Sequence, residues 1–223
     1  MAPPPFNPLI PVIELVFTVI AVLSCLLIYF KTKEIYKLTK HKGIQYFREA
    51  FLLFGLSYLM RFLFSLTMLS SFAFDFIVPR HMFGPVFILP MGYLSTIGIF
   101  YLIFSSIWKR FNNKTMLIMG HALAVMLSVV SFITRSHEIL LLLQSIFLVA
   151  AVILSFIARK DKKKLSEAKI LYMLVGVLWL INLWVIDKGG RRPLVAPGTE
   201  IFFYILSLVV FVIIYYKVSK WLK

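Results

Sequence analysis

The hydrophobic positions of this chain fall into seven long runs, separated by short polar segments. A run such as LLLLQSIFLVAAVILSFIA shows neither the alternation of a half-buried strand nor the polar face of a surface helix. A helix needs about 20 such residues to cross a hydrocarbon layer about 30 Å thick. The pattern therefore predicts seven membrane-spanning helices, over 9–30, 50–71, 86–108, 115–134, 139–158, 170–186 and 201–216.

Composition excludes a soluble fold. Residues of the AVILMFWYC set make up 61% of the 223 positions, only 15% are charged, and the mean hydropathy is +0.93. Ordinary soluble domains carry about 25% charged residues. The longest polar segment, 31–49, is too short to bury a core of its own. We predict one all-α membrane domain over 1–223, a polytopic seven-helix bundle.

The distribution of basic residues predicts the orientation. Of the 24 lysines and arginines, 18 lie in 31–49, 109–114, 159–169 and the C-terminal tail, which alternate with segments that hold only five. Short loops rich in Lys and Arg stay on the cytoplasmic side. We therefore expect a multi-pass plasma membrane protein with its N-terminus outside and its C-terminus cytoplasmic. The net charge of +15 is then a topology signal, and we expect no nucleic-acid partner.

Segment 31–49 predicts more than a loop. The first helix continues through it to Gly43, a glycine in the position of a C-terminal cap, and Ile35 and Leu38 are expected to share one face. This helix either projects into the cytosol or bends onto the membrane surface, and we favour the bend. Its lysines and those of 159–169 either only fix the topology or also bind anionic lipids or a protein partner. The predicted contacts are Lys31, Lys33, Lys37, Lys40, Lys162, Lys163 and Lys164.

Polar side chains inside the spans are the candidate site. A charged side chain at mid-helix costs about 2.5–3.5 kcal/mol on insertion scales, so an intramembrane ionisable residue is a functional hypothesis by default. Several such groups lie toward the outer ends of their spans, and Arg61 in the second span can reach outward along its stem. Together they predict an outward-facing vestibule that binds a ligand. Its predicted residues are Glu14, Arg61, Gln144, Asn182 and Trp179.

Glu14 and Arg61 form the sharpest pair. Their estimated depths differ by about 7 Å at 1.5 Å per residue, a gap that a guanidinium can close. Three interpretations stay open: an ion pair that only stabilises the bundle, a substrate or ion site, or two side chains that extend separately to opposite edges. His121 is the only histidine within a span, which excludes a bis-histidine haem and favours a hydrogen-bonded packing role. Trp179 either lines the pocket or anchors at the membrane interface.

Enzymatic chemistry is not expected. The chain has no GxSxG elbow, no HExxH, no glycine-rich phosphate loop and no Cys/His metal spacing. Glu14 is the only carboxylate well inside a span, so a general acid and base pair in the membrane is hard to assemble. We expect a protein without catalytic residues, metal or cofactor.

Two families share parts of this pattern. EAFLLFGLSYLMRF (49–62) aligns with EAKILYMLVGVLWL (167–180) at a constant offset of 118, which suggests that spans 1–3 and 5–7 are parallel repeats. The length, topology and repeat resemble the SWEET sugar transporters, built as three helices, a linker helix and three more. Their PQ dipeptide is absent, as are prolines in the fifth and sixth spans. The topology also resembles G-protein-coupled receptors, without their DRY and NPxxY motifs.

A third resemblance says least about what the protein does. IYFKTKEIYKLTKHKGIQYFREAFLLFGLSYLMRFLF (28–64) is similar to small uncharacterised seven-helix membrane proteins of archaea, which implies an archaeal plasma membrane and no particular activity. We favour a non-enzymatic, sensor- or receptor-like membrane protein that binds a ligand or partner in the vestibule and has a basic cytoplasmic face. A small-solute transporter and an accessory subunit of a membrane complex are the alternatives.

Overall fold

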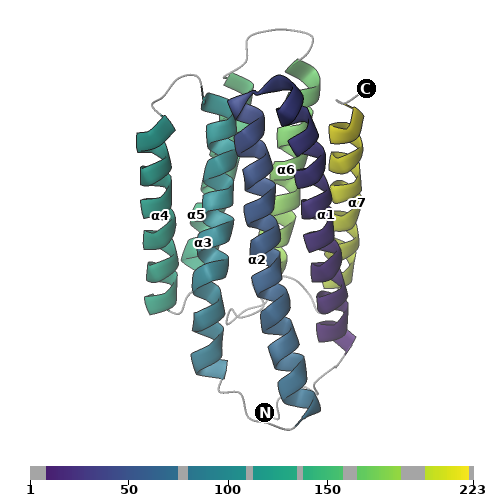
Figure 1. Ribbon diagram of the computed structural model, residues 1–223. Helices are drawn as coiled ribbons and strands as arrows, with labels where there is room; N and C mark the ends of the chain where they lie inside the picture. Colours follow the sequence, from purple (N-terminus) through teal and green to yellow (C-terminus); the bar gives the residue numbers. More distant parts are fainter. Residues whose placement is uncertain are drawn as a thin grey trace.

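The computed structural model describes residues 9–74, 80–108, 113–134, 138–157, 165–186 and 199–220. These residues form seven α-helices (Figure 1). The end of the bundle at the bottom of Figure 1 is called the lower end, and the opposite end is called the upper end. Helix α1 begins at the lower end, and α7 ends at the upper end. The helices are α1 (Leu9–Thr39), α2 (Lys42–Ala73), α3 (Arg80–Ile107), α4 (Asn113–Thr134), α5 (Glu138–Ile157), α6 (Leu165–Ile186) and α7 (Thr199–Lys220).

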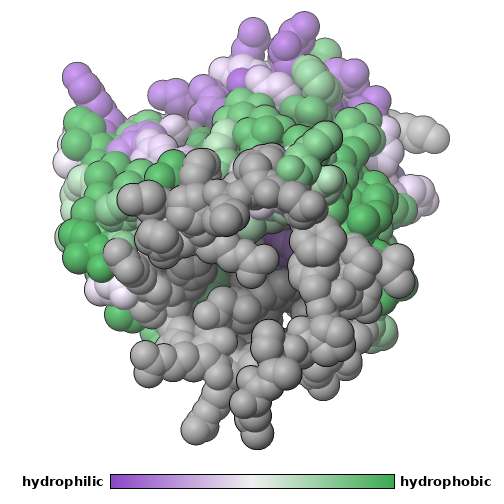
Figure 2. All heavy atoms as spheres, turned by 90° about the horizontal axis from the view of Figure 1, so that it is seen from below, coloured by the Kyte–Doolittle hydropathy of each residue, from purple (hydrophilic) through white to green (hydrophobic). Residues whose placement is uncertain are grey.

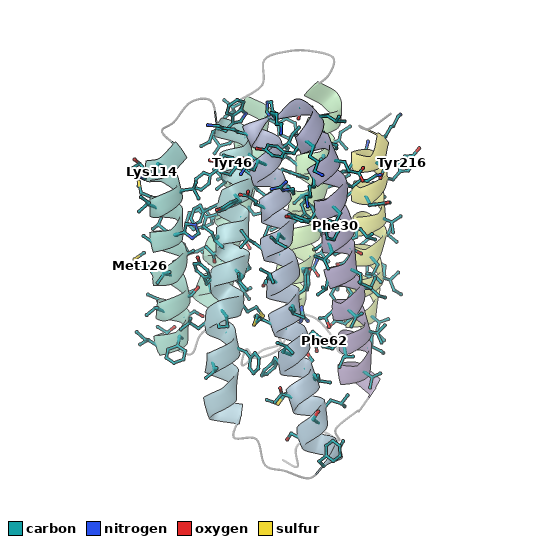
Figure 3. All side chains as sticks on the ribbon, in the orientation of Figure 1. Phe30, Tyr46, Phe62, Lys114, Met126 and Tyr216 are labelled. Carbon is teal, nitrogen blue, oxygen red and sulfur yellow. The ribbon has the colours of Figure 1, made fainter. Side chains whose placement is uncertain are left out.

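The flanks of the bundle are those of a membrane protein. Six helices, α1 to α5 and α7, are long and apolar enough to cross a membrane, and the described apolar stretch of α6 is shorter, Ile170–Asn182. Met126 on α4 and Tyr216 on α7 point away from the bundle (Figure 3), and they are 53% and 68% exposed. Exposed apolar side chains of this kind lie along every described span, as a lipid-facing surface requires. The all-helical fold class is confirmed, and six of the seven predicted spans are long and apolar enough, as described, to cross a membrane.

Six helices form a closed ring and the seventh lies outside it. Each ring helix packs on the next in the order α1, α2, α3, α5, α6, α7, and α7 packs back on α1. Helix α4 packs mainly on α3, with a minor contact to α5, at the edge of the bundle (Figure 1). This order places α1–α3 and α5–α7 in equivalent halves of the ring with α4 between them in sequence. The arrangement is the one that two parallel three-helix repeats and a linker helix would produce.

Aromatic side chains fill the middle of the ring. Phe51 and Phe54 of α2 are fully buried, and the Phe54 ring lies 3.9 Å, centroid to centroid, from the indole of Trp179 on α6. Tyr58, one turn further along α2, contacts both Trp179 and Phe211 of α7. These rings join α2 to the helices opposite it, with which it shares no direct backbone packing. The interior beside and above Trp179 is therefore closed by aromatic packing.

The junction of α1 and α2 corrects one prediction. Helix α1 ends at Thr39, Lys40 adopts a left-handed conformation with φ of 52°, and α2 begins at Lys42. The predicted cap at Gly43 is wrong, because the chain reverses three residues earlier. Gly43 lies in the first turn of α2, where a Cβ would come within 2.9 Å of the Ser105 carbonyl oxygen and 3.0 Å of the Trp108 ring. Its small size serves close packing on α3.

The end of α1 packs on the bundle. Its last turns curve across the upper end toward α2 (Figure 1), and the Tyr36 hydroxyl donates to Gln45 Oε1 of α2 at 3.3 Å. Ile35 is buried, whereas Leu38 is 80% exposed, so the prediction that they share a face is wrong. Phe47, inside the predicted polar segment 31–49, belongs to the core. This segment is thus two helix ends joined by a two-residue turn.

Basic side chains gather at the upper end. The lysines within the described residues belong to segments at that end: the end of α1 and the turn after it, the start of α2, α4 and α6, and the end of α7, as the labelled Lys114 illustrates (Figure 3). This clustering at one end agrees with the uneven distribution of lysines and arginines along the sequence. Which end faces the cytoplasm stays a prediction from the loop-charge rule.

Candidate functional site

Glu14 and Arg61 meet inside the bundle. The Arg61 guanidinium donates to Glu14 Oε1 through Nη2 at 2.8 Å and through Nε at 2.9 Å, which joins α1 to α2. The same Nη2 lies 3.4 Å from the Tyr204 hydroxyl of α7. The side chains are only 6% exposed for Arg61 and 17% for Glu14. Of the three interpretations that the sequence leaves open, separate extension to opposite edges is wrong, because the two side chains pair.

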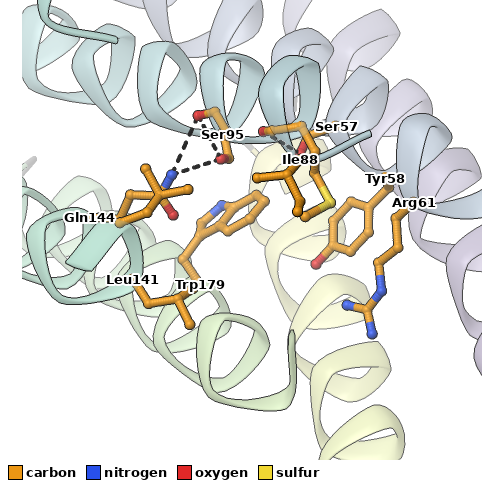
Figure 4. Close-up of a pocket in the computed structure, with 11 residues that line it drawn as sticks. Ser57, Tyr58, Arg61, Ile88, Ser95, Leu141, Gln144 and Trp179 are labelled. Atoms are coloured by element: carbon orange, nitrogen blue, oxygen red, sulfur yellow. Dashed lines mark hydrogen bonds between the residues drawn. The ribbon is translucent and has the colours of Figure 1, made fainter. Parts of the chain in front are cut away.

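A small pocket lies beside this pair. Figure 4 shows it between α2, α3, α5 and α6, and Figure 2, viewed from the lower end, shows hydrophilic atoms deep within the middle of that face. Its volume is about 20 Å³, space for about one ordered water molecule. Most of the lining is apolar. It consists of Ser57, Tyr58, Arg61, Ile88, Met91, Gly92, Ser95, Leu140, Leu141, Gln144 and Trp179.

Gln144 forms the polar wall on the α5 side. Its amide Nε2 donates to Ser95 Oγ at 2.8 Å and to Thr96 Oγ1 at 2.7 Å, both on α3. Figure 4 draws the bond to Ser95, which lines the pocket. Ser95 and Thr96 in turn donate to the Gly92 carbonyl oxygen, one turn earlier. The glutamine is thus fixed between two ring helices, and one wall of the pocket has a set geometry.

Three buried polar atoms around the pocket have no partner among the described residues. They are the Tyr58 hydroxyl, Arg61 Nη1 and Trp179 Nε1. The residues that carry them are at most 5% exposed. A buried donor left unpaired costs about 1–3 kcal/mol, and native proteins satisfy nearly all such groups with protein, water or ligand atoms. Water or ligand atoms that pair with these groups would lie in or beside the pocket.

The structure places three of the five predicted vestibule residues around one pocket. Arg61, Gln144 and Trp179 line one pocket, and Glu14 holds the far side of the Arg61 guanidinium without lining it. Asn182 does not line the pocket. Its Nδ2 donates to the Leu178 carbonyl oxygen of its own helix at 2.7 Å, and its buried Oδ1 has no partner among the described residues. Trp179 is 2% exposed, so it is an interior residue and not an interfacial anchor.

Sequence reasoning missed four participants. Tyr58 stands three residues before Arg61, one helical turn away on the same face, and this spacing was a usable signal. Ser95 and Thr96 are small residues in an apolar span, and nothing in the local sequence indicates that they meet Gln144 of α5. Tyr204 comes from α7, and nothing in the local sequence indicates that it reaches the Arg61 guanidinium. Its position follows from ring closure.

The predicted lysine contacts at the upper end are placed in part. Lys37 and Lys40 are exposed, whereas Lys31 is half-buried and lies 3.1 Å from Glu34. Lys162, Lys163 and Lys164 lie outside the described residues. Below the lysines, the Arg48 guanidinium lies over the Tyr29 and Tyr36 rings, 5.2 and 5.1 Å from their centroids, in cation–π contact.

Other candidate centres are structural. His121 of α4 shares a hydrogen bond with the Tyr93 hydroxyl of α3 at 2.8 Å through Nδ1, which confirms its packing role. The side chains described in the structure include no group of three His, Cys, Asp or Glu residues that could hold a metal ion. The pocket beside Arg61 is thus the best-defined candidate site.

Comparisons with known proteins place the chain without assigning it an activity. No protein family model matches it, and no solved structure does. The chain is 28% identical to an uncharacterized protein of Archaeoglobus fulgidus over 231 aligned residues, which cover 99% of each chain. The resemblance to uncharacterised archaeal proteins is confirmed.

Proposed function

We propose that this is a receptor-like membrane protein without catalytic activity, which binds a small ligand in the pocket beside Arg61. One observation carries the proposal: three buried donors around one cavity, those of Tyr58, Arg61 and Trp179, have no partner among the described residues. Buried donors in native proteins are bonded to protein, water or ligand atoms, and the described protein atoms supply no partner here. A ligand's acceptor atoms supply what the fold leaves out.

The position of the pocket supports a site loaded from one side. Tyr58 and Arg61 lie in the half of α2 nearer the lower end, and Gln144 lies within two turns of the start of α5 at that end. Toward the upper end, Phe54 and Phe51 close the interior against Trp179. A ligand therefore enters from the lower end, which the loop-charge rule assigns to the outside of the plasma membrane.

Ring contacts also join the pocket to the basic upper end. Trp179 contacts Phe54, Phe54 contacts Phe51, and Phe51 contacts Phe47, whose ring lies 5.8 Å from that of Tyr172 on α6. A ligand that moves the Trp179 indole thus acts on a continuous column of packed rings. At its upper end are the exposed lysines, which we assign to anionic lipid headgroups and a protein partner.

Native mass spectrometry of the protein, gently extracted from its own membrane, tests ligand binding. We expect a small-molecule adduct on the wild type that is weakened in Tyr58→Phe, which removes one hydroxyl and keeps the ring. Tyr46→Phe, the same change on the same helix, is the matched control, since Tyr46 lies far from the pocket. An adduct equally strong in all three proteins would move the ligand elsewhere. Lipid alone in every case would reject an organic ligand.

A small-solute transporter is the second candidate, favoured by the helix order. The ring α1–α2–α3–α5–α6–α7 with α4 outside is compatible with two parallel repeats around the pocket, and 49–62 and 167–180 then occupy opposite positions. A transporter must open at both ends, so the aromatic closure at Phe54 would have to separate in a second state.

Solute flux separates the two candidates. A receptor-like protein in proteoliposomes takes up no solute, whatever binds to it. Uptake of the molecule identified by mass spectrometry, reduced by Tyr58→Phe and retained in Tyr46→Phe, would establish the transporter instead. An accessory subunit is indicated if a second membrane protein copurifies in fixed proportion.

A further inference from the structure

A second cluster of polar side chains lies outside the ring of helices, where α4 packs on α3. His121 of α4 and two tyrosines of α3, Tyr93 and Tyr101, are half-buried there. The Tyr93 hydroxyl lies 2.8 Å from His121 Nδ1, and the Tyr101 ring packs edge-to-face on the imidazole, with 6.2 Å between the ring centroids. None of the three lines the pocket beside Arg61. The cluster is therefore a separate group of polar atoms within the membrane.

The hydrogen bond to Tyr93 joins α4 to α3 and also fixes the protonation of the imidazole. Among the described residues, His121 Nδ1 is the one partner of the Tyr93 hydroxyl. If Nδ1 were the donor, the phenol proton would have no acceptor, which is costly inside a membrane. We therefore assign Tyr93 as the donor and Nδ1 as the acceptor. The proton of the neutral imidazole is then on Nε2, which becomes a donor.

His121 Nε2 and the Tyr101 hydroxyl are open to the lipid. Neither atom has a hydrogen-bond partner among the described residues, and neither is sealed inside the protein. Helix α4 lies outside the ring with α3 between it and the interior, so the open atoms of His121 face outward. His121 is seven residues from Lys114, which is about 10 Å along α4 at 1.5 Å per residue. At this depth no water reaches the two donors.

The depth of the two donors restricts the molecule that can satisfy them. It must dissolve in the hydrocarbon layer and present an oxygen that accepts a hydrogen bond. The carbonyl and phosphate oxygens of phospholipids lie in the interfacial region, outside the hydrocarbon core. The donors are therefore placed for a lipid-soluble molecule whose polar group lies deeper in the membrane than a phospholipid headgroup.

The surroundings of the donors favour a flat ring. The Tyr101 ring also contacts Tyr46 of α2 and Phe104 of α3, with 5.7 and 6.1 Å between centroids. Gly120, next to His121, allows α4 to approach this aromatic group closely, because a Cβ there would come within 3.0 Å of the Phe104 ring. Aromatic side chains pack well against other flat rings. Quinones combine a flat ring, carbonyl acceptors and an apolar tail.

We propose that the lipid-facing surface around His121 binds a lipid-soluble carbonyl compound of the quinone class. A carbonyl oxygen of this compound accepts a hydrogen bond from His121 Nε2, and the neighbouring Tyr101 hydroxyl is the second donor. The proposal concerns binding alone and includes no electron transfer. It goes beyond the proposed ligand pocket beside Arg61 and does not depend on it.

Native mass spectrometry of the purified full-length protein in detergent, titrated with decylubiquinone, tests the proposal. Decylbenzene, which has the ring and the tail without a carbonyl oxygen, is the control compound. We expect the wild type to bind decylubiquinone more tightly than decylbenzene. Tyr101→Phe and His121→Leu each remove one donor and should each lower the affinity for decylubiquinone about fivefold, without changing the affinity for decylbenzene.

Tyr216→Phe is the matched control variant. Tyr216 of α7 is a lipid-facing tyrosine, 68% exposed, and lies outside the cluster, so its hydroxyl should not affect the affinity. Tyr101→Phe keeps the aromatic ring and its packing, so it keeps the test valid if His121→Leu does not fold.

Three results would overturn the proposal. Equal affinities for the two compounds, or no adduct with either, would mean that the donors bind no carbonyl oxygen. A decylubiquinone affinity that is the same in the wild type, Tyr101→Phe and Tyr216→Phe would place the compound elsewhere on the lipid surface. An affinity lowered by Tyr58→Phe and not by Tyr101→Phe would place it in the pocket beside Arg61. The first two results would leave the proposed role of that pocket unchanged.

Discussion

Gly98 of α3 lies directly beneath the ring of Phe54 on α2. A Cβ at position 98 would be 2.4 Å from Cε1 and 2.6 Å from Cδ1 of that ring, closer than packed atoms approach. Phe54 is fully buried against Trp179 and has no open side to move to. The glycine thus sets the distance between α2 and α3 at the level where the aromatic layer closes the interior.

Gly98→Ala should therefore destabilise the bundle by about 1–3 kcal/mol, the usual cost of an overpacked core. Thermal unfolding in detergent measures it. Adding Phe54→Leu to Gly98→Ala should cost less than the sum of the two single changes, because the smaller side chain relieves the clash. Additive losses would show that the two residues do not compete for this space.

Arg61→Ala should be more harmful than Arg61→Lys. The alanine removes the Arg61 guanidinium that pairs with the Glu14 carboxylate inside the membrane. Breaking a buried ion pair by removing one partner costs about 3–5 kcal/mol. A lysine keeps the charge but replaces the two parallel donors with one point charge, so it recovers part of the loss. Expression, monodispersity and unfolding midpoint together check the order. Equal stability of the wild type and both variants would show that the ion pair does not support the fold.

Lys40→Gly should stabilise the protein by about 1 kcal/mol. Lys40 is the described non-glycine residue with a positive φ, and a lysine there bears a steric penalty that glycine avoids. Lys37→Gly, one turn earlier within α1, removes the same charge from a regular helical position and should destabilise by about 0.5–1 kcal/mol. If both glycines shift the unfolding midpoint in the same direction, the turn at Lys40 is not left-handed in solution.

Gln144→Leu should weaken the contact between α3 and α5. It removes the amide that donates to Ser95 and Thr96, a bond of the kind that contributes about 0.6–2 kcal/mol between membrane helices. Thr96→Val alone removes one acceptor and should cost less. The double variant should cost less than the sum, since both changes break the same bond. Strict additivity would place the Gln144 amide elsewhere.

The sequence predicts the fold class and much of the site because burial costs dominate there. Apolar runs long enough to span a membrane have few alternatives to helices, and an intramembrane Glu and Arg reduce each other's cost when they meet. The depths of Glu14 and Arg61 follow from residue counts along two consecutive helices, and these depths made pairing one of the open interpretations, which the structure selects.

Other features depend on neighbours that no local pattern identifies. The turn between α1 and α2 was misplaced at Gly43, since a glycine that permits close packing on α3 looks in sequence like one that ends a helix. Asn182 is as polar as Gln144, yet one turns to its own helix and the other crosses to α3. That difference depends on the rotation of each helix within the ring, which the uniformly apolar spans leave open.

An experimental density map of the protein in lipid nanodiscs tests the central claim most directly. We predict a peak in the pocket between α2, α3, α5 and α6, within hydrogen-bonding distance of one or more of the Tyr58 hydroxyl, Arg61 Nη1 and Trp179 Nε1. The Glu14–Arg61 pair should be present beside it. A pocket closed by side chains, with both nitrogens bonded to protein atoms and no density between them, would contradict a ligand site there.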